Sequence, residues 1–477
     1  MTPGCGVNDN SVTVVAIANR LPVRHGDDGW ELSPGGLVTA LRPVMATYDD
    51  GAWVGWDGGT RGIPATLPDL KVQLLSISLS AAQVRQYYHG FSNATLWPLL
   101  NYAIERPRFE RAWWHSYTVV NSTFADAAVA ALDDRPGALA WVHDYHLMLV
   151  PELIRERRPD QAVGFFLHVP WPPPDIFARL PWRAEILRGL LGADVVSFHT
   201  EVYRRNFLRA CGRLLAGTGI QIHGSAITLP TGRVVRTSSA PISIDAGEFS
   251  RLATEPATDA EIAALSEQFA DRALLLGVDR LDYTKGITER LLAVEMLLER
   301  RPDLRAKVAF LQIAVPSRDD VPEYRSLRAA VERHIGRING RFTEPGSDVP
   351  VHYLYRGLPQ HQLAAYYAVA ASLLVTPLID GMNLVAKEYV TVQQARRGSG
   401  SLVLSEFTGA AVELREAVPC NPFDVEGLSY RIEHALGLSP STRRIAIATM
   451  ARRIRAHDVH HWVAQQVADI AARGARR

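Results

Sequence analysis

The chain has 477 residues, of which 21% are charged and 47% are hydrophobic, and its formal net charge is +1. This length is sufficient for two or three domains with large hydrophobic cores. Because the net charge is close to zero, composition excludes a general electrostatic attraction to nucleic acid or to an anionic membrane, and any anion site must be local.

The cysteines and the apolar runs indicate a soluble, cytoplasmic protein. Cys5, Cys211 and Cys420 are scattered, odd in number and without a CxxC pair, which argues for a reducing compartment and against disulfides or structural zinc. The opening stretch MTPGCGVNDNSV lacks a basic region followed by an apolar run, and nowhere do about 18 apolar residues run together. We therefore expect neither a signal peptide nor a membrane-spanning helix.

Strand-like apolar runs alternate with helix-length segments along the chain. The runs cover residues 12–18, 138–142, 163–167, 195–198, 273–278, 308–313 and 372–376. This alternation is typical of parallel α/β sheets. The strands are too numerous for one mononucleotide-type sheet, so we expect two Rossmann-like domains.

A break in the alternation marks the expected domain junction. Residues 237–259, TSSAPISIDAGEFSRLATEPATD, consist largely of small, polar and proline residues. We therefore predict an N-terminal domain over residues 1–240 and a C-terminal domain over residues 241–450. The remaining tail, residues 451–477, follows a pattern that looks helical from about residue 440 and ends in basic residues.

Charged and polar residues follow six of the predicted strands, at the point where each strand ends. Those in the first half are Arg20 in NRLP, Asp144 in HDYH and His168 before VPWPPPDIF. Those in the second half are Arg280 and Lys285, Arg318 in VPSRDD, and the segment PLIDGMNLVAKE. Ligands of open α/β sheets bind beyond the carboxyl ends of the strands. We therefore expect the two sheet edges to face each other across a cleft that binds more than one phosphate group.

The loop DRLDYTKG carries the clearest anion signal. It joins the strand at 273–278 to a segment whose apolar spacing predicts one helix face, and Gly286 relaxes the backbone where that helix begins. The helix N-terminus offers free N–H groups, and Arg280 and Lys285 add two positive charges. Phosphate or diphosphate is the expected ligand. Taken alone, the same residues could form a solvated loop with i,i+3 ion pairs.

The segment LIDGMNLVAKEYV predicts a second phosphate-binding helix start. Gly381 allows a tight turn, and Asn383 is a favourable N-cap, so Leu384 and Val385 would present backbone N–H groups to a phosphate. Glu388 lies one turn further along, where a carboxylate could accept hydrogen bonds from ribose hydroxyls. The alternative is an N-capped helix whose Glu388 faces solvent.

Four motifs together resemble those of the trehalose-6-phosphate synthases, which are retaining glycosyltransferases of the GT-B fold. They are GFFLHVPWP, HDYHLMLVP, GVDRLDYTKG and DGMNLVAKEYV, and the similarity runs from NRLPV to HHW near the end. The resemblance implies transfer of glucose from a nucleotide sugar, usually UDP-glucose, to glucose 6-phosphate, giving alpha,alpha-trehalose 6-phosphate. It also implies that the last helix packs back on the first domain. We expect no cofactor, with nucleotide-glucose as co-substrate, and a homo-oligomer, either a dimer or a tetramer.

The resemblance also assigns roles to individual residues. Donor-binding residues would be Gly35, Gly36, Arg280, Lys285, Leu358, Asp380, Gly381, Met382, Asn383, Leu384, Val385 and Glu388. Acceptor-binding residues would be Arg20, Tyr88, Trp97, Asp144 and Arg318. Catalysis would rest on four residues, with Arg280 and Lys285 clamping the diphosphate while His168 and Asp380 hold the transferring glucose. The segment VHYLYRGLPQ offers no clear base-reading side chain, which leaves UDP-, GDP- and ADP-glucose open as donors.

The expected chemistry needs no metal. Many glycosyltransferases hold Mg²⁺ with an Asp-x-Asp motif, but no two aspartates of this chain stand two apart. Arg280 and Lys285 would instead stabilise the leaving diphosphate where its charge develops. For the retaining reaction we favour front-face attack over a covalent carboxylate adduct, with Asp380 as a hydrogen-bonding group.

Two histidine groups are weak metal signals. His143 and His146 have no evident third ligand, and the spacing of His457, His460 and His461 is typical of a packed or solvated helix face.

Three other functions compete with this interpretation. A nicotinamide dehydrogenase would also use α/β domains, but no GxGxxG follows a strand. A non-catalytic sugar-phosphate sensor would keep the binding residues without turnover. A glucosyltransferase with another phosphorylated acceptor, such as glycerol 3-phosphate, is the nearest alternative, because Arg20 and Arg318 recognise the phosphate more obviously than the rest of the acceptor.

Overall fold

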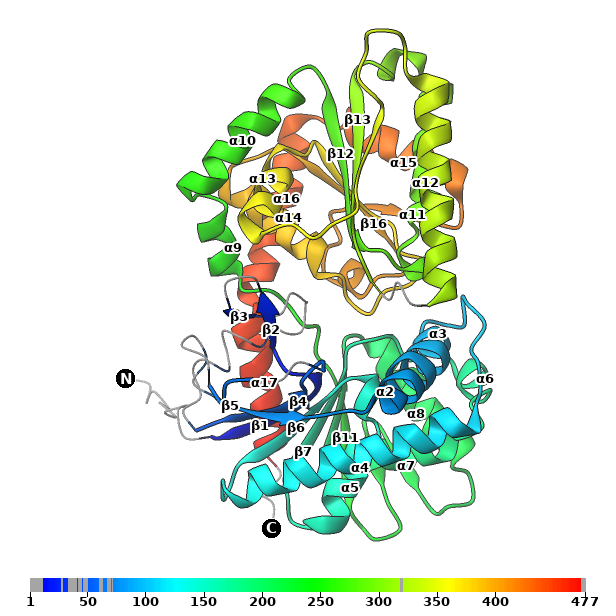
Figure 1. The fold of residues 1–477 in the computed structure, drawn as a ribbon, viewed down its shortest axis with the longest axis vertical. Coiled ribbons are helices and arrows are strands. Elements are labelled where there is room, and N and C mark those ends of the chain that lie inside the picture. The colour runs from blue at the N-terminus through cyan, green and yellow to red at the C-terminus, as the bar shows by residue number, and fades with distance from the viewer. Residues whose placement is uncertain are drawn as a thin grey trace. The chain divides into compact units, whose positions relative to one another are not determined.

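The structure, a computed structural model, describes residues 12–26, 29–32, 41, 45, 50–59, 63–66, 70, 72–317 and 321–472. The chain forms two compact units, each with a central sheet and flanking helices (Figure 1). Unit 1 comprises residues 1–242 and 459–477, and unit 2 comprises residues 243–458. The prediction of two Rossmann-like α/β units is confirmed.

Among the described residues, unit 1 contains a nine-stranded sheet in the order β5-β4-β1-β6-β7-β8-β11-β10-β9. Its strands are β1 (Val14–Arg20), β4 (Ala52–Trp56), β5 (Gln73–Ile77), β6 (Leu139–His143), β7 (Val163–Leu167), β8 (Val195–Phe198), β9 (Gln221–His223), β10 (Ala226–Thr228) and β11 (Val234–Ser239). Neighbours from β5 to β11 pair in parallel, whereas β10 and β9 are antiparallel additions at one edge. A separate hairpin is formed by β2 (Val23–Gly26) and β3 (Gly29–Leu32).

The helices of unit 1 include a long π-helical segment. They are α2 (Ala81–Gln83), η2 (Val84–Leu96), α3 (Trp97–Leu100), α4 (Arg111–Asp133), η3 (Tyr145–Leu147), α5 (Val150–Arg157), α6 (Pro174–Phe177), α7 (Arg183–Leu191), α8 (Glu201–Leu214) and α17 (Val459–Ala471). The segment η2 has π-helical hydrogen bonding over 13 residues. Such geometry is rare in helices and is frequently found at functional sites.

The last helix, α17, returns to the sheet of unit 1, as predicted. The buried indole of Trp462 lies 5.2 Å from the ring of Trp141 and 4.9 Å from that of Phe166, and its Nε1–H donates to the carbonyl of Ala240 over 3.2 Å. Gly164 of β7 leaves room for the helix, since an added Cβ would lie 2.3 Å from Ile470 Cδ1. A central strand and the C-terminal helix therefore share one core.

Unit 2 contains a six-stranded parallel sheet in the order β14-β13-β12-β15-β16-β17. Its strands are β12 (Ala273–Arg280), β13 (Val308–Val315), β14 (Val351–Leu354), β15 (Ser372–Val375), β16 (Ser401–Ser405) and β17 (Val418–Cys420). Its helices are α9 (Ala246–Leu252), α10 (Pro256–Gln268), η4 (Tyr283–Lys285), α11 (Ile287–Arg300), η5 (Pro302–Leu304), α12 (Pro322–Phe342), α13 (Gln360–Val369), α14 (Leu384–Ala395), η6 (Gly409–Val412), α15 (Val425–Gly437) and α16 (Pro440–Ala456). Figure 1 shows α10 and α13 on one side of this sheet and α11 and α12 on the other.

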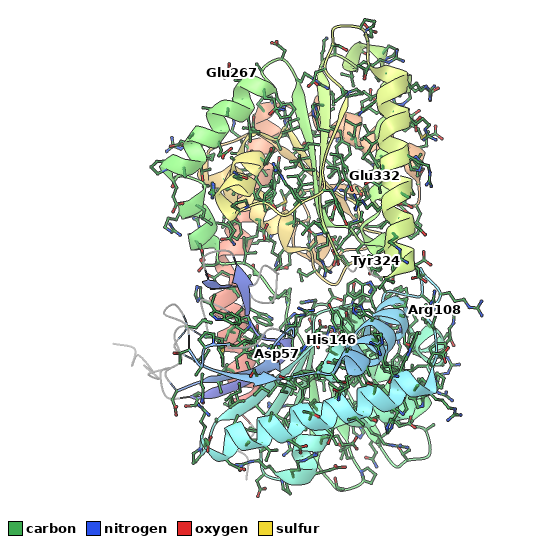
Figure 2. All side chains as sticks on the ribbon, in the orientation of Figure 1. Asp57, Arg108, His146, Glu267, Tyr324 and Glu332 are labelled. Carbon is green, nitrogen blue, oxygen red and sulfur yellow. The ribbon has the colours of Figure 1, made fainter. Side chains whose placement is uncertain are left out.

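Apolar side chains on the face of this sheet that α11, α12 and α15 cover form a large hydrophobic core cluster of unit 2. The contacts of α11 with α12 and α15 bury the helix face that its apolar spacing predicts, including Ile287, Leu291, Val294 and Leu298. Tyr324 stands at the N-terminal end of α12 (Figure 2). The loop that precedes α11 is therefore anchored by a helix packed deep in the unit.

The observed boundaries differ from the predicted ones in two places. The first junction lies at 242/243, compared with 240/241, and the second at 458/459, compared with 450/451. The second falls later because α16 packs against α14 within unit 2 and the return to unit 1 begins only at α17. Residues 237–259 are also not a continuous break in the α/β series, since they contain the end of β11, all of α9 and the start of α10.

Within the part of the chain that the structure describes, no helix combines the length and apolar character needed to cross a bilayer. Cys211 and Cys420 are buried free thiols, and burial raises the pKa of both. A raised thiol pKa disfavours the reactive thiolate.

Candidate functional site

The predicted polar residues lie where strands of the two sheets end. In unit 1, Arg20 is the last residue of β1, Asp144 directly follows β6 and His168 directly follows β7. Because these strands are parallel neighbours, their carboxyl ends share one sheet edge. In unit 2, Arg280 is the last residue of β12, and Asp380 follows the neighbouring strand β15. Each unit thus carries one set of candidate residues at one sheet edge.

Arg20 belongs to a layer of stacked rings. Its guanidinium carbon lies 4.4 Å from the ring centroid of Trp56 and 5.2 Å from that of Tyr88. Tyr88 in turn stacks on His146, with centroids 5.9 Å apart and an interplanar angle of 13°. Cation–π contacts of this kind orient a guanidinium while leaving its N–H groups available. Sequence reasoning missed Trp56 and assigned no role to His146. Trp56 could have been found from its position at the end of β4, which pairs with β1 and so brings Trp56 beside Arg20.

Tyr88 and Trp97 are brought near this edge by the π-helical segment. Tyr88 lies within η2, and Trp97 begins α3 directly after it. The indole of Trp97 is buried, with its ring 5.7 Å from Tyr145. Trp97 is therefore a buried packing residue next to η2, whereas the ring of Tyr88 is partly accessible to solvent.

His168 is held as a neutral imidazole. Its Nε2 lies 3.1 Å from Nδ1 of the fully buried His143. Burial lowers the pKa of His143 to about 3, and burial together with the neighbouring His143 and His199 lowers the pKa of His168 well below its ordinary value. A neutral imidazole can exchange hydrogen bonds with a hydroxyl group without adding charge to the site.

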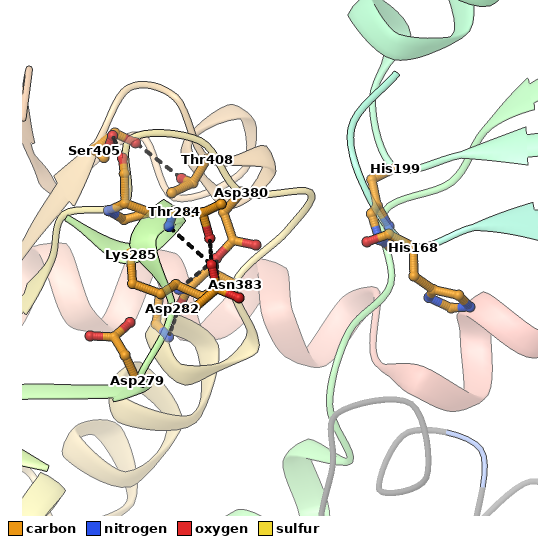
Figure 3. A network of polar contacts seen from close by, with 12 residues as sticks. His168, His199, Asp279, Asp282, Thr284, Lys285, Asp380, Asn383, Ser405 and Thr408 are labelled. Atoms are coloured by element: carbon orange, nitrogen blue, oxygen red, sulfur yellow. Dashed lines mark hydrogen bonds and ion pairs between the residues drawn. The ribbon is translucent and has the colours of Figure 1, made fainter. Parts of the chain in front are cut away.

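Two further contacts fix the backbone of His168. His199 Nδ1 accepts a hydrogen bond from the backbone N–H of Ile242 over 3.4 Å, so its Nε2 carries the proton and donates to the carbonyl of His168 over 3.2 Å (Figure 3). Asp144, whose φ is +72°, accepts from the backbone N–H of His168 over 3.3 Å. A positive φ at a non-glycine residue is frequent at functional sites.

In unit 2, Lys285 and Asp380 form an ion pair. Lys285 Nζ lies 2.6 Å from Asp380 Oδ2, and Asn383 Nδ2 donates to the same oxygen over 3.1 Å (Figure 3). Asn383 also caps α14, because its Oδ1 accepts from the backbone N–H of Ala386 over 3.1 Å. The predicted N-cap is confirmed. The left-handed backbone falls at Asn383, with φ +82°, whereas the turn was expected at Gly381.

The loop that carries Lys285 is fixed by close packing. Gly286 has φ +60°, and an added Cβ would lie 2.2 Å from the carbonyl oxygen of Thr376. Asp282 Oδ1 accepts from the backbone N–H and hydroxyl of Thr284 over 3.0 and 2.9 Å, and its Oδ2 accepts from the hydroxyl of Tyr324 over 2.9 Å. The prediction that Gly286 relaxes the backbone where this helix begins is confirmed.

A buried guanidinium that the sequence analysis did not identify lies beneath this loop. Arg290 on α11 is fully buried and forms an ion pair of 2.7 Å with Asp279. It also donates to the side chains of Gln312 and Thr376 over 2.8 and 2.9 Å and to the carbonyl of Lys285 over 3.3 Å. Arg290 thus joins β12, β13, the end of β15 and the Lys285 loop.

Glu388 does not face solvent freely, which excludes the alternative of a solvated helix face. It lies partly buried on α14, and its Oε2 accepts a hydrogen bond of 2.9 Å from the hydroxyl of Tyr367. Burial raises the pKa of the Glu388 carboxyl to about 7. Tyr367 was not predicted, because it lies 21 residues away on α13.

The remaining predicted residues fall into three groups. Gly35, Gly36 and Arg318 lie outside the described residues. Arg280 is exposed, and Leu358 is partly buried between β14 and α13. The last group comprises the first turn of α14 and the residues before it: Gly381, Met382, Leu384 and Val385. Among the described residues, no three or more His, Cys, Asp or Glu side chains are arranged to hold a metal ion.

Two parallel-sheet α/β units with charged loops at their strand ends match the architecture of the GT-B glycosyltransferases. Solved structures agree over nearly the whole chain. The alpha,alpha-trehalose-phosphate synthase (UDP-forming) from Burkholderia vietnamiensis is 34% identical with a TM-score of 0.88, covering 98% of both chains. The enzyme from Burkholderia xenovorans in complex with glucose-6-phosphate is 33% identical with a TM-score of 0.87, covering 96% of this chain and 99% of that one.

The sequence comparisons identify the family. The model of glycosyltransferase family 20 matches residues 10–472. The trehalose-6-phosphate synthase of Mycobacterium avium is 43% identical, with complete coverage of both chains, and that of Mycobacterium ulcerans is 45% identical over 94% of this chain and 91% of its own. The chain belongs to glycosyltransferase family 20 and is a hexosyltransferase, as the motifs predict.

Proposed function

We propose that this chain is a retaining glucosyltransferase that transfers glucose from a nucleotide-glucose to glucose 6-phosphate. The products would be alpha,alpha-trehalose 6-phosphate and a nucleoside diphosphate. The observation that carries the proposal is the Lys285–Asp380–Asn383 cluster, which brings a cation and a carboxylate together at the N-terminus of α14. One solved relative, from E. coli, is described as bound with UDP-2-fluoro glucose and is 33% identical with a TM-score of 0.86.

Unit 2 would hold the donor. The N-terminus of α14 offers the backbone N–H groups of Leu384 and Val385 to the diphosphate, and Lys285 with Arg280 adds positive charge. Glu388 would bind the ribose, oriented by its hydrogen bond from Tyr367. The loop around Leu358 gives no clear base-reading side chain, so UDP-glucose is the expected donor by family, with ADP- and GDP-glucose as the other candidates.

Unit 1 would hold the acceptor. Arg20 would bind the phosphate of glucose 6-phosphate, because its guanidinium is oriented by Trp56 and Tyr88. Asp144 would accept hydrogen bonds from acceptor hydroxyls, and the neutral imidazole of His168 would bind a hydroxyl of the transferring glucose. By resemblance to the family, Arg318, which lies outside the described residues, would be a second ligand of the acceptor phosphate.

The chemistry we propose is front-face attack. The bond from glucose C1 to the diphosphate oxygen breaks while the acceptor hydroxyl oxygen bonds to C1 from the same side, and the hydroxyl proton passes to the departing oxygen. Lys285 and Arg280 stabilise the charge that develops on this oxygen. Asp380 Oδ2 already accepts from Lys285 and Asn383, which lowers its strength as a nucleophile. We therefore propose that Asp380 orients the sugar and forms no covalent adduct.

We further propose that the reaction needs no metal ion, since the chain has no Asp-x-Asp motif and Lys285 with Arg280 would supply the positive charge that Mg²⁺ provides in other glycosyltransferases. Enzyme dialysed against EDTA should keep its full rate. Loss of activity that Mg²⁺ restores would contradict this proposal.

A homo-oligomer and a cytoplasmic location also remain predictions.

A panel assay tests the proposed function. Purified protein would be incubated with UDP-, ADP- or GDP-glucose and with glucose 6-phosphate or glycerol 3-phosphate, and products would be identified by NMR. We expect trehalose 6-phosphate with both anomeric centres in the α configuration. A preference for glycerol 3-phosphate would favour the alternative acceptor, and binding of both substrates without turnover would indicate a sensor.

Mass spectrometry tests the role of Asp380. Enzyme quenched during turnover should carry no glucosyl group on any peptide, because attack occurs from the acceptor side. Asp380→Asn should retain the α configuration of the product at a reduced rate. A glucosyl ester on Asp380 in the wild-type protein would overturn front-face attack.

The pKa of Glu388 predicts a pH-dependent affinity for the donor. With a pKa of about 7, the carboxylate form that accepts ribose hydrogen bonds dominates above pH 7 and is lost below it. The KM for the nucleotide sugar should therefore rise about tenfold between pH 8 and pH 6, which follows from the ionised fraction. Glu388→Gln should give a raised KM with little dependence on pH over this range. An unchanged pH dependence in Glu388→Gln would assign the titration to another group.

A further inference from the structure

An arginine-lined groove lies on unit 1, built from residues that the proposed reaction does not use. It has a volume of about 620 Å³ and is lined by α6, α8 and the turn between β9 and β10. Four guanidinium groups line it, those of Arg204, Arg205, Arg209 and Arg213. Its apolar lining comes from Pro174, Leu208 and Ile222. Volumes of a few hundred Å³ with an apolar lining and a few charged groups are typical of small-molecule sites.

The charges of this groove do not balance. Arg204 and Arg205 both pair with Glu201 at 2.5–2.7 Å, and Arg213 pairs with Asp175. Four guanidinium groups therefore meet two carboxylates, which leaves two positive charges in excess. The whole chain has a net charge of only +1, so this excess is a local feature.

Arg209 is the centre of the imbalance. It lies four residues after Arg205 and four before Arg213, so the three side chains form one ridge on α8. Like charges at this spacing oppose helix formation. Within the described residues, Arg209 is exposed and makes no hydrogen bond or ion pair, whereas its two neighbours on the ridge have carboxylate partners. An unneutralised charge of this kind can be satisfied by an anionic ligand.

We propose that this groove is a binding site for a nucleotide, separate from the donor and acceptor sites. The planar guanidinium fork of arginine matches phosphate oxygens, so Arg209 would bind the phosphates together with Arg205 and Arg213. The apolar surface of Leu208 and Ile222 suits a planar base better than a hydroxyl-rich sugar. Two excess charges require a ligand with at least two negative charges, which a di- or triphosphate provides.

Fluorescence titration of the full chain with trinitrophenyl-ATP tests the proposal. The titration would be run with excess glucose 6-phosphate but without UDP, because UDP is itself a nucleotide and would compete for the groove; binding that Arg209→Glu weakens is assigned to the groove. We expect saturable binding that Arg209→Glu weakens at least tenfold and Arg209→Gln weakens less. The matched control is Arg452→Glu, an exposed helical arginine of unit 2, which should leave the affinity within about twofold.

Three results would overturn the proposal. They are the absence of binding to the wild-type protein under these conditions, equal weakening by Arg452→Glu and Arg209→Glu, and competition by an acidic peptide but not by ATP. Circular dichroism of each variant would verify that it is folded. The titration requires no turnover and compares variants of the groove alone. A negative titration would therefore not contradict the proposed glucosyl transfer, and absence of glucosyl transfer in the panel assay would not contradict nucleotide binding in the groove.

Discussion

Lys285→Ala is expected to lower kcat/KM by about 10²–10³, the scale for losing one preorganised group that stabilises developing charge. The ammonium group lies 2.6 Å from Asp380, and Lys285 stands near the end of the loop that leads into α11. Removal of the ammonium group eliminates a positive charge that would stabilise the leaving diphosphate. It also leaves the Asp380 carboxylate with one hydrogen-bond partner fewer. Steady-state kinetics with varied donor concentration measures the effect, and Arg280→Ala should give a loss of the same order.

Lys307→Ala provides the matched control. Lys307 is exposed and directly precedes β13, at the opposite end of the same sheet from Lys285. Its substitution removes the same charge from unit 2, yet kcat/KM should stay within about twofold of wild type. Near-wild-type kinetics in both Lys285→Ala and Arg280→Ala would remove the proposed diphosphate clamp.

Arg290→Met is expected to destabilise the protein more than any surface substitution. It would leave the carboxylate of Asp279 buried without its ion-pair partner, which costs about 3–5 kcal/mol. For a unit of this size, the midpoint of thermal unfolding should fall by on the order of 10 °C. Gly277 shows how closely this pair is packed, because an added Cβ would lie 2.5 Å from Arg290 Nη1.

The pH dependence of the Arg290→Met variant provides a second measurement. Burial already raises the pKa of Asp279 in the wild-type protein, with Arg290 opposing this shift. Without Arg290, ionisation of Asp279 becomes still less favourable in the folded state, so stability is lost as the pH rises and the deficit should be smaller at pH 5 than at pH 8. Arg301→Met, which removes the ion pairs of Arg301 with Asp303 and Glu433 near the surface, should change the melting temperature little. A deficit independent of pH would show that lost packing, and not the unpaired charge, dominates.

Several parts of the candidate site could be predicted because their cause is local. The side chain of Asn383 caps α14 by accepting a hydrogen bond from the backbone N–H three residues later. Gly286 takes the left-handed conformation where α11 begins. Both follow from short-range backbone geometry that a sequence pattern carries. The placement of Arg20, Asp144 and His168 at one edge follows from parallel pairing, which the alternation of strands and helices predicts.

Other parts could not be predicted because they depend on distant partners. Trp56 orients Arg20 across two neighbouring strands, and Tyr367 binds Glu388 from another helix. His199 reaches the carbonyl of His168 over 31 residues of sequence. Each of these polar contacts depends on side-chain direction after packing, for which no periodic signal exists in the chain.

The sequence by itself determined the fold class, the two-unit organisation and the strand ends that carry charge. These follow from apolar periodicity, since a strand buried on both faces must be apolar over its whole length. Only the tertiary structure decided the protonation of the site. Burial raises the pKa of Glu388 to about 7 and lowers that of His143 to about 3. The physical reason is that desolvation depends on what packs around a group, and packing joins residues that the sequence keeps far apart.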